Sequence, residues 1–339
     1  MKKNILGLCA FLLGMQFTQA QYATLRVAGG YAGPGIFKQE QIIGPKIDPF
    51  SPQKDGLLPM SDINDSVPSI KNLYGSYGQG MNFTLAAGYM FNPYIGLEMG
   101  VSYLQSATYS CDQTRELTLE VLPGQYSSIG KYMNAHITTN AFGLSIMPSI
   151  NIQGAKPGWK VYPYGRLGIS LPVFGALYHN VKIDMASDVD SAFITGTLSK
   201  SPYFLGKRTD VTLKTEGTVS IGFNGAVGVA YKPLPYLAIT LELNGQYLVT
   251  RAKKAEITKW ETDGNDRIAD RGVYRTEFNF VDKLDNKSNN EDYNSTTDKT
   301  KPKDDLRPTA PFSNLGFNIG VSFMLSKQTL KKQEKPAGN

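Results

Sequence analysis

Cysteine is nearly absent from this chain of 339 residues. Only Cys9 and Cys111 occur, and Cys9 lies in an N-terminal apolar run. We expect that run to be removed on export, which would leave Cys111 alone in the mature protein. A single cysteine excludes an intramolecular disulfide, so the chain must be stabilised by other means.

Long apolar runs are also missing after residue 20. No stretch there approaches the roughly 18 consecutive apolar residues of a membrane helix, and the mean hydropathy is −0.26. A search for long apolar runs does not detect the strands of a membrane β-barrel. Their lipid-facing apolar residues alternate with small or polar ones, so that the average hydropathy of each strand stays low. The sequence therefore excludes membrane helices but leaves a membrane β-barrel open.

A cluster of basic residues is the third missing feature. The chain has 35 Lys and Arg residues against 29 Asp and Glu residues, and loss of Lys2 and Lys3 with the N-terminal run would leave a net charge of +4. The charges are interspersed along the chain instead of forming a basic face. We therefore predict no nucleic-acid partner.

The first twenty residues have the three regions of a secretory signal peptide. Lys2 and Lys3 precede an apolar run over residues 5–13, and Thr18-Gln19-Ala20 places small residues where a signal peptidase cleaves. We predict cleavage after Ala20. A lipoprotein would need a cysteine at the end of the apolar run, and Cys9 lies inside it.

Alternation with a period of two recurs eight times in the rest of the chain. In residues 314–325, Leu, Phe, Ile and Val alternate with a second set made mostly of Gly, Ser and Asn. Such small polar residues would make a poor water-excluded core, so the apolar face must contact something other than a protein core. The eight segments are residues 22–32, 80–91, 95–108, 136–152, 160–177, 219–231, 237–250 and 314–325.

The connections between these segments alternate between short and long. Three are short and rich in Pro, Gly or Asn, near residues 92–94, 154–159 and 232–236. Four are long, covering about residues 33–79, 109–135, 178–218 and 251–313. Short periplasmic turns and long extracellular loops are typical of outer-membrane barrels, and an even strand number returns both termini to the periplasm.

These features predict an all-β protein with an eight-stranded antiparallel up-and-down transmembrane β-barrel in the outer membrane of a Gram-negative bacterium. The expected organisation is a signal peptide (residues 1–20), a barrel domain with four long extracellular loops (21–326) and a periplasmic tail (327–339). The signal, the eight segments, the loop alternation and Gly-rich strands such as residues 82–90 together resemble the family of small outer-membrane barrels that includes the OmpA transmembrane domain and OmpX.

The resemblance implies a non-enzymatic outer-membrane protein that is structural, is exposed at the cell surface and presents its loops for adhesion or ligand binding, because such barrels include structural proteins, adhesins and binding proteins. Its implied partners are outer-membrane lipids, lipopolysaccharide, the barrel assembly machinery and an extracellular ligand. A narrow pore or a secretion-associated subunit is the alternative. The last long loop, with 13 acidic and 13 basic residues between Arg251 and Phe312, suits a hydrated surface.

Four charged residues should face the barrel interior. Extending the alternation along the strands places Arg26, Glu98, Arg166 and Glu242 on the inward face, near the periplasmic end. An eight-stranded barrel is just wide enough to be filled by side chains, so buried charges must be paired. We predict an Arg/Glu network that blocks the lumen, which argues against an open porin.

Aromatic residues cluster where the two membrane interfaces should lie. One group adjoins the short turns and the other lies near the far strand ends. The predicted interfacial aromatics are Tyr89, Phe91, Tyr94, Trp159, Tyr162, Tyr231 and Tyr236 in the first group, and Tyr31, Tyr103 and Tyr247 in the second.

One pair of residues suggests an enzyme. His136 and Thr138 share an outward face, which faintly resembles the His-x-Ser arrangement of a lipid A deacylase barrel, where imidazole activates a hydroxyl. However, threonine replaces serine, and no carboxylate is evident on the fifth segment to orient the histidine. We therefore predict no catalytic residues, with a lipid A-modifying enzyme as the minor alternative.

Two groups of residues could suggest a metal site. His179 precedes Asp184, Asp188 and Asp190, but the spacing fits no ligand pattern, so a solvated loop is expected. In the last loop the residues with suitable oxygen ligands lack the glycine and closing glutamate of an EF-hand; they are Asp263, Asn265, Asp266 and Asp270. We predict no metal and no other cofactor.

Overall fold

The computed structural model describes residues 22–34, 40–46, 56–59, 61–64, 69–122, 125–154, 159–185 and 208–326. The expected signal peptide and C-terminal tail lie outside these residues. The described part is almost entirely β-structure, with one short helix, α3 (Val273–Thr276). None of its helices is long and apolar enough to cross a membrane.

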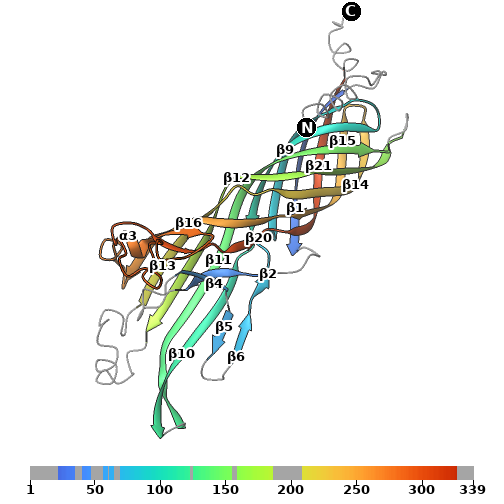
Figure 1. The fold of residues 1–339 in the computed structure, drawn as a ribbon. Coiled ribbons are helices and arrows are strands. Elements are labelled where there is room, and N and C mark those ends of the chain that lie inside the picture. The colour runs from blue at the N-terminus through green and yellow to red at the C-terminus, as the bar shows by residue number, and fades with distance from the viewer. Residues whose placement is uncertain are drawn as a thin grey trace, which may run out of the picture.

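Eight antiparallel strands close into a barrel in chain order, as the alternation predicted (Figure 1). Each strand pairs with the next, and the last pairs with the first. The strands are β1 (Tyr22–Pro34), β8 (Gly80–Met90), β9 (Ile95–Ser106), β11 (Gln125–Gln153), β12 (Val161–Met185), β14 (Gly222–Leu234), β15 (Leu237–Tyr247) and β21 (Asn314–Ser326).

The barrel wall has an apolar outside and a small or polar inside. On β21, Phe317 and Ile319 are about two-thirds exposed, whereas Asn318 between them is buried. Glycine on the inner side makes room for larger groups. A Cβ added at Gly228 would lie 2.9 Å from the Cβ of Glu242, so this glycine allows the glutamate side chain to stand inside the barrel.

Several of the strands continue well beyond the barrel, so the long connections that the sequence predicted contain β-strands of their own. β11 and β12 have 29 and 25 residues, more than the roughly 9 to 11 that cross a bilayer. Their outer halves pair with further strands. This outer sheet consists of those halves together with β10 (Tyr109–Leu122), β13 (Arg208–Gly217), β16 (Val249–Thr262) and β18 (Glu277–Val281).

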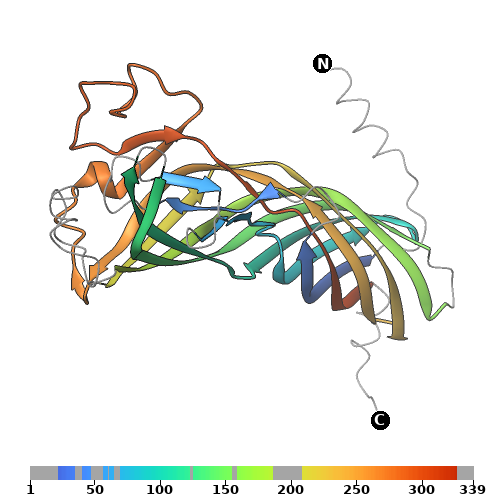
Figure 2. The same ribbon diagram turned by 90° about the horizontal axis from the view of Figure 1, so that it is seen from below.

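Shorter strands complete the outer part of the molecule. β5 pairs with β10 and β19 with β18, both in parallel. The short strands are β2 (Glu40–Gln41), β3 (Ile43–Lys46), β4 (Gly56–Pro59), β5 (Ser61–Asn64), β6 (Ser69–Asn72), β7 (Tyr74–Gly75), β17 (Asn265–Asp266), β19 (Lys303–Leu306) and β20 (Thr309–Pro311). Figure 2 shows the barrel and the outer sheet as two ends of one elongated structure.

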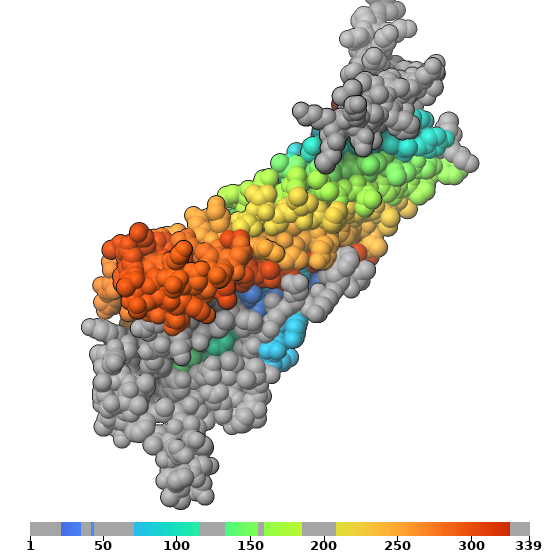
Figure 3. All heavy atoms as spheres, in the orientation of Figure 1, coloured from blue at the N-terminus to red at the C-terminus, as the bar shows by residue number. Residues whose placement is uncertain are grey.

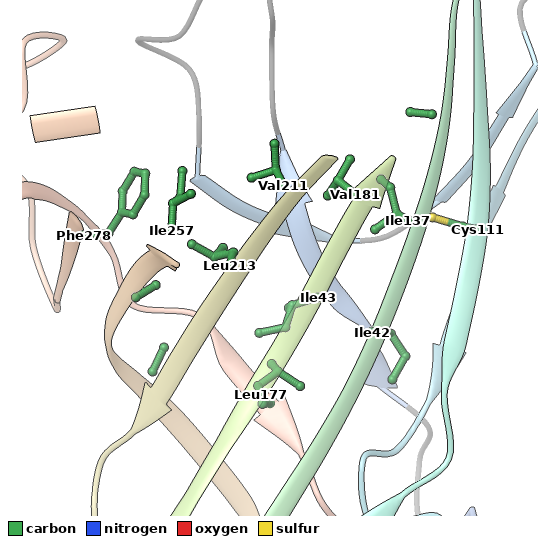
Figure 4. Close-up of a cluster of buried hydrophobic side chains, with 14 of the residues drawn as sticks. Ile42, Ile43, Cys111, Ile137, Leu177, Val181, Val211, Leu213, Ile257 and Phe278 are labelled. Atoms are coloured by element: carbon green, nitrogen blue, oxygen red, sulfur yellow. The ribbon is translucent and has the colours of Figure 1, made fainter. Parts of the chain in front are cut away.

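The outer sheet has an apolar core on its concave side. Ile137 of β11, Val181 of β12, Leu213 of β13 and Ile257 of β16 point toward one another (Figure 4) and are almost fully buried. Ile42 joins them from the segment before β3. In the outer sheet, the burial of these apolar side chains away from water drives folding, whereas the apolar side chains of the barrel contact lipid.

The polar segment between β18 and β19 is organised by Asn289. Its side-chain amide donates to the carbonyl oxygens of Asp298 and Pro302, each at 2.9 Å, and its side-chain oxygen accepts from the backbone N–H of Asp298 at 2.8 Å. The segment therefore has a defined structure despite its low-complexity composition. In Figure 3 the region from β16 to β20 (orange) forms a bulky mass on one side of the outer end.

Candidate functional site

The structure brings the four predicted lumen charges into contact. Arg26 Nη2 lies 2.7 Å from Glu98 Oε1, and Arg26 Nη1 lies 3.4 Å from Glu242 Oε1. Arg166 also contacts both glutamates, with Nη1 at 3.1 Å from Glu98 and Nη2 at 2.6 Å from Glu242. Two arginines and two glutamates thus alternate across the barrel, and their charges cancel.

Glu242 is the most enclosed member of this network. Its side chain is fully buried and accepts further hydrogen bonds from the Tyr164 hydroxyl at 2.8 Å and the Asn318 amide at 3.2 Å. Sequence reasoning missed these two donors. Both have the inward parity of their strands, and Tyr164 stands two residues before Arg166, so the alternation would have identified them.

Two small cavities flank the network. The cavity lined by Tyr22, Arg26 and Gln153 has a volume of about 30 Å³, and the one lined by Arg166, Asn224 and Asn244 has a volume of about 50 Å³. Each has room for only a few water molecules. The lumen is therefore filled at this level, as expected for a barrel of eight strands.

The predicted interfacial aromatics include one error, Tyr162. This residue is only 5 % exposed and packs inside the barrel with Tyr164 and Met324. It shares the inward parity of Arg166, so its position beside a short turn does not place it at the membrane interface. Phe91 is half-buried, and the others are exposed on the outer surface: Tyr31, Tyr89, Tyr94, Tyr103, Trp159, Tyr231, Tyr236 and Tyr247.

His136 has a carboxylate partner that the sequence did not reveal. Its Nδ1 lies 2.6 Å from Asp112 Oδ1, and Asp112 stands on the preceding strand, β10, directly opposite His136. Both side chains are exposed, at 48 % and 78 %. Among the described residues, His136 has no hydroxyl group as a hydrogen-bond partner, so the pair lacks a nucleophile in position.

His179 does not lie in a solvated loop, which corrects the prediction. It is part of β12, faces the core of the outer sheet and is fully buried. Neither ring nitrogen has a hydrogen-bond partner among the described residues. Burial lowers the pKa of His179 to about 3, because charging the ring inside an apolar core would be costly. Asp188 and Asp190 lie outside the described residues.

The carboxylates of the last long segment already accept hydrogen bonds from other residues or form ion pairs with them. Asp263 Oδ1 accepts from the Arg208 backbone N–H at 3.0 Å, and Asp266 Oδ1 accepts from that of Ile268 at 2.9 Å. Asp270 pairs with Arg267 at 3.3 Å. In the part of the chain that the structure describes, no group of three or more His, Cys, Asp or Glu residues could hold a metal ion.

Comparison with known proteins identifies a family. The sequence model of the outer membrane protein beta-barrel domain matches residues 7–280, which is most of the chain. No curated protein matches the sequence.

Similar solved structures include three outer-membrane proteins. OprG from Pseudomonas aeruginosa is 10% identical, with 91% of this chain and 97% of that chain covered and a TM-score of 0.35. Ail from Yersinia pestis and Neisserial surface protein A (NspA) are each 10% identical, with 90% of this chain and 97% of theirs covered and TM-scores of 0.24 and 0.29.

Proposed function

Because the chain belongs to the outer membrane protein beta-barrel domain family, we propose that it is a non-enzymatic barrel that anchors a surface-exposed platform for adhesion or ligand binding. One observation carries the proposal: the barrel strands continue into an outer sheet that has its own apolar core. A core of this kind holds a surface in a fixed shape, and a preorganised surface loses less entropy when a ligand binds.

The contents of the lumen support an anchor over a pore. Arg26, Arg166, Glu98 and Glu242 are paired across the barrel, and an ion that passed them would have to separate charges in a low-dielectric interior. We expect purified protein in planar bilayers to show no steady single-channel openings. Steady openings in the unmodified protein would favour the narrow-pore alternative.

The segment between β18 and β19 is the candidate binding surface. Its ends are adjacent, because the Arg307 N–H donates to the Val281 carbonyl oxygen at 3.0 Å. Residues 282–306, which include β19, can therefore be replaced by a short flexible Gly/Ser linker. The excised protein should keep the barrel and the remaining outer sheet.

The test compares cells that display the intact and the excised protein on immobilised extracellular-matrix proteins. Loss of adhesion at equal surface expression is the expected result. Asp263→Asn, in the tight turn after β16, is the control outside the excised segment and should leave adhesion unchanged. Equal adhesion of all three proteins would overturn the binding part of the proposal and leave the anchor intact.

Lipopolysaccharide and other outer-membrane lipids are the partners of the apolar barrel surface in this proposal, and the barrel assembly machinery is its partner during insertion. The exposed aromatics support the first assignment, since Trp and Tyr favour the membrane interface.

A further inference from the structure

The segment between β7 and β8 crosses the extracellular mouth of the barrel. β11 and β21 stand on opposite sides of the barrel, four strands apart around the ring of eight. The Tyr77 hydroxyl lies 3.2 Å from the hydroxyl of Thr139, just beyond the barrel part of β11. The backbone N–H of Tyr77 donates to the carbonyl oxygen of Pro311, shortly before β21, at 2.8 Å. A single residue therefore reaches from one side of the mouth to the other.

The same segment is also held from the side of β10. The hydroxyl of Tyr109, the first residue of β10, donates to the Ser76 carbonyl oxygen at 2.7 Å and accepts from the Ser76 backbone N–H at 3.0 Å. The Ser76 hydroxyl donates to the Pro311 carbonyl oxygen at 3.3 Å and accepts from the Gly78 N–H at 3.0 Å. Ser76 and Tyr77 are buried. Hydrogen bonds thus fix the segment to three different strands or their ends.

Gly78 allows the segment to pass close to the wall of the barrel. A Cβ added at Gly78 would lie 2.1 Å from the Phe312 carbonyl oxygen and 3.0 Å from Nδ2 of Asn314. Asn314 also lines the cavity of about 50 Å³ on the extracellular side of the Arg/Glu network, together with Asn224 and Asn244. The segment therefore lies over this cavity.

We propose that residues 75–79 form a lid that closes the extracellular mouth and acts as a second barrier, independent of the Arg/Glu network. The cavity between them is then a chamber lined by side-chain amides, with the lid above it and the network below it. The two barriers differ in kind, because the network depends on paired charges and the lid on the packing and hydrogen bonds of Tyr77. The proposal does not depend on the adhesion surface, which lies in residues 282–306.

The test labels a cysteine placed inside the chamber. Asn244→Cys in a Cys111→Ala background is prepared as the full protein in lipid nanodiscs and treated with a small anionic methanethiosulfonate, which does not cross lipid. Intact mass spectrometry follows the reaction. With the lid closed, labelling should be slow because it requires local opening. Lys182→Cys in the same background, exposed on the outer face of β12, should be labelled rapidly in every variant and confirms that the reagent is active.

Two pairs of variants compare an open lid with a closed one. The side chain of Gly78→Ala does not fit in the closed lid, so labelling of Asn244→Cys should rise at least about tenfold. Gly33→Ala, whose Cβ would meet its nearest atom at 3.8 Å, should leave the rate unchanged. Tyr77→Ala should act like Gly78→Ala, with Tyr74→Ala, at an exposed tyrosine of the same connection, as its control. Unchanged labelling in the folded open-lid variants would overturn the proposal.

A milder variant keeps the test decisive if both open-lid variants fail to fold. Tyr109→Phe removes one hydroxyl group from the lid and no packing, so labelling should rise about threefold or more, the effect of one lost hydrogen bond. Rapid labelling of Asn244→Cys with the lid intact would overturn the proposal. It would show that the chamber is reached by another route, such as the cavity of about 330 Å³ beside Phe174 and Val219.

The independence of the two barriers has a separate measurement. Gly78→Ala should still show no steady single-channel openings in planar bilayers, because the charges of the network remain paired across the lumen. Steady openings in Gly78→Ala, with none in the unmodified protein, would contradict a second barrier and make the lid the sole one.

Discussion

The two halves of β11 bury the same face of the strand but place opposite kinds of side chain on it. In the barrel, Ile150 and Ile152 are about half-exposed and Ser149 is buried. In the outer sheet, Ile137 is buried and His136 is exposed. The surroundings therefore decide which face is apolar: lipid contacts the outside of the barrel, and water contacts the outside of the outer sheet.

The two halves also differ in what fills their interiors. The barrel interior holds a charge-neutral network whose stability depends on complete pairing. The outer sheet holds packed apolar side chains, where each contact contributes through buried area. Removal of one charged side chain should therefore destabilise the barrel by leaving its partners unpaired. Removal of one apolar side chain should destabilise the outer sheet through the loss of buried area.

The largest effect is expected from Glu242→Ala. Loss of this carboxylate leaves Arg166 and Arg26 short of a buried partner, which typically costs about 3–5 kcal/mol. Urea unfolding in lipid vesicles measures this loss of unfolding free energy. The unfolding is followed through the fluorescence of Trp159 in a Trp260→Phe background. Glu256→Ala, exposed on β16, is the control with an expected change near zero. A loss below about 1 kcal/mol for Glu242→Ala would show that the lumen tolerates unpaired charge.

Trp260→Ala should have the next largest effect, confined to the outer sheet. Trp260 is 2 % exposed, and Trp-to-Ala changes in cores cost about 3–5 kcal/mol. Its indole N–H has no hydrogen-bond partner among the described residues, so the cost should lie at the lower end, about 3 kcal/mol. Hydrogen exchange should rise in β13 and β16 while the barrel stays protected. Faster exchange throughout the barrel would mean that the two halves unfold together.

His179 should make the outer sheet sensitive to acid. Its folded-state pKa of about 3 lies below the ordinary value, so the unfolded chain binds a proton first as the pH falls. The contribution of His179 to the free energy of unfolding is fully present above about pH 6.5. It is lost toward pH 3 at about 1.4 kcal/mol per pH unit, which amounts to about 2 kcal/mol at pH 5. Denaturation of the outer sheet at pH 7 and pH 5 measures this. His179→Leu should remove most of the difference; an equal difference in both proteins would assign it to other groups.

Asp112→Asn should have the smallest effect. The contact with His136 is exposed, and such pairs contribute about 0–1 kcal/mol. The free energy of unfolding should change by less than about 1 kcal/mol, and lipopolysaccharide incubated with either protein should release no acyl chains in mass spectra. Acyl release by the unmodified protein that disappears in Asp112→Asn would instead reveal an enzyme.

The alternation predicted the barrel, because a period of two places residues on two faces whatever the partner strand is. The same parity placed Arg26, Glu98, Arg166 and Glu242 on the inner face. Tyr162 was misplaced when proximity to a turn outweighed parity.

The outer sheet was harder to predict, because its pairing joins distant segments. Asp112 and His136 become neighbours only through the register of β10 against β11.

The sequence by itself determined that this chain forms eight strands with one apolar and one small or polar face, since each residue carries its own side chain and its own parity. Only the tertiary structure decided that the long connections form a second sheet and that His179 is buried. The physical reason is that parity is local, whereas pairing, burial and gaps depend on which distant strands meet and where their register breaks.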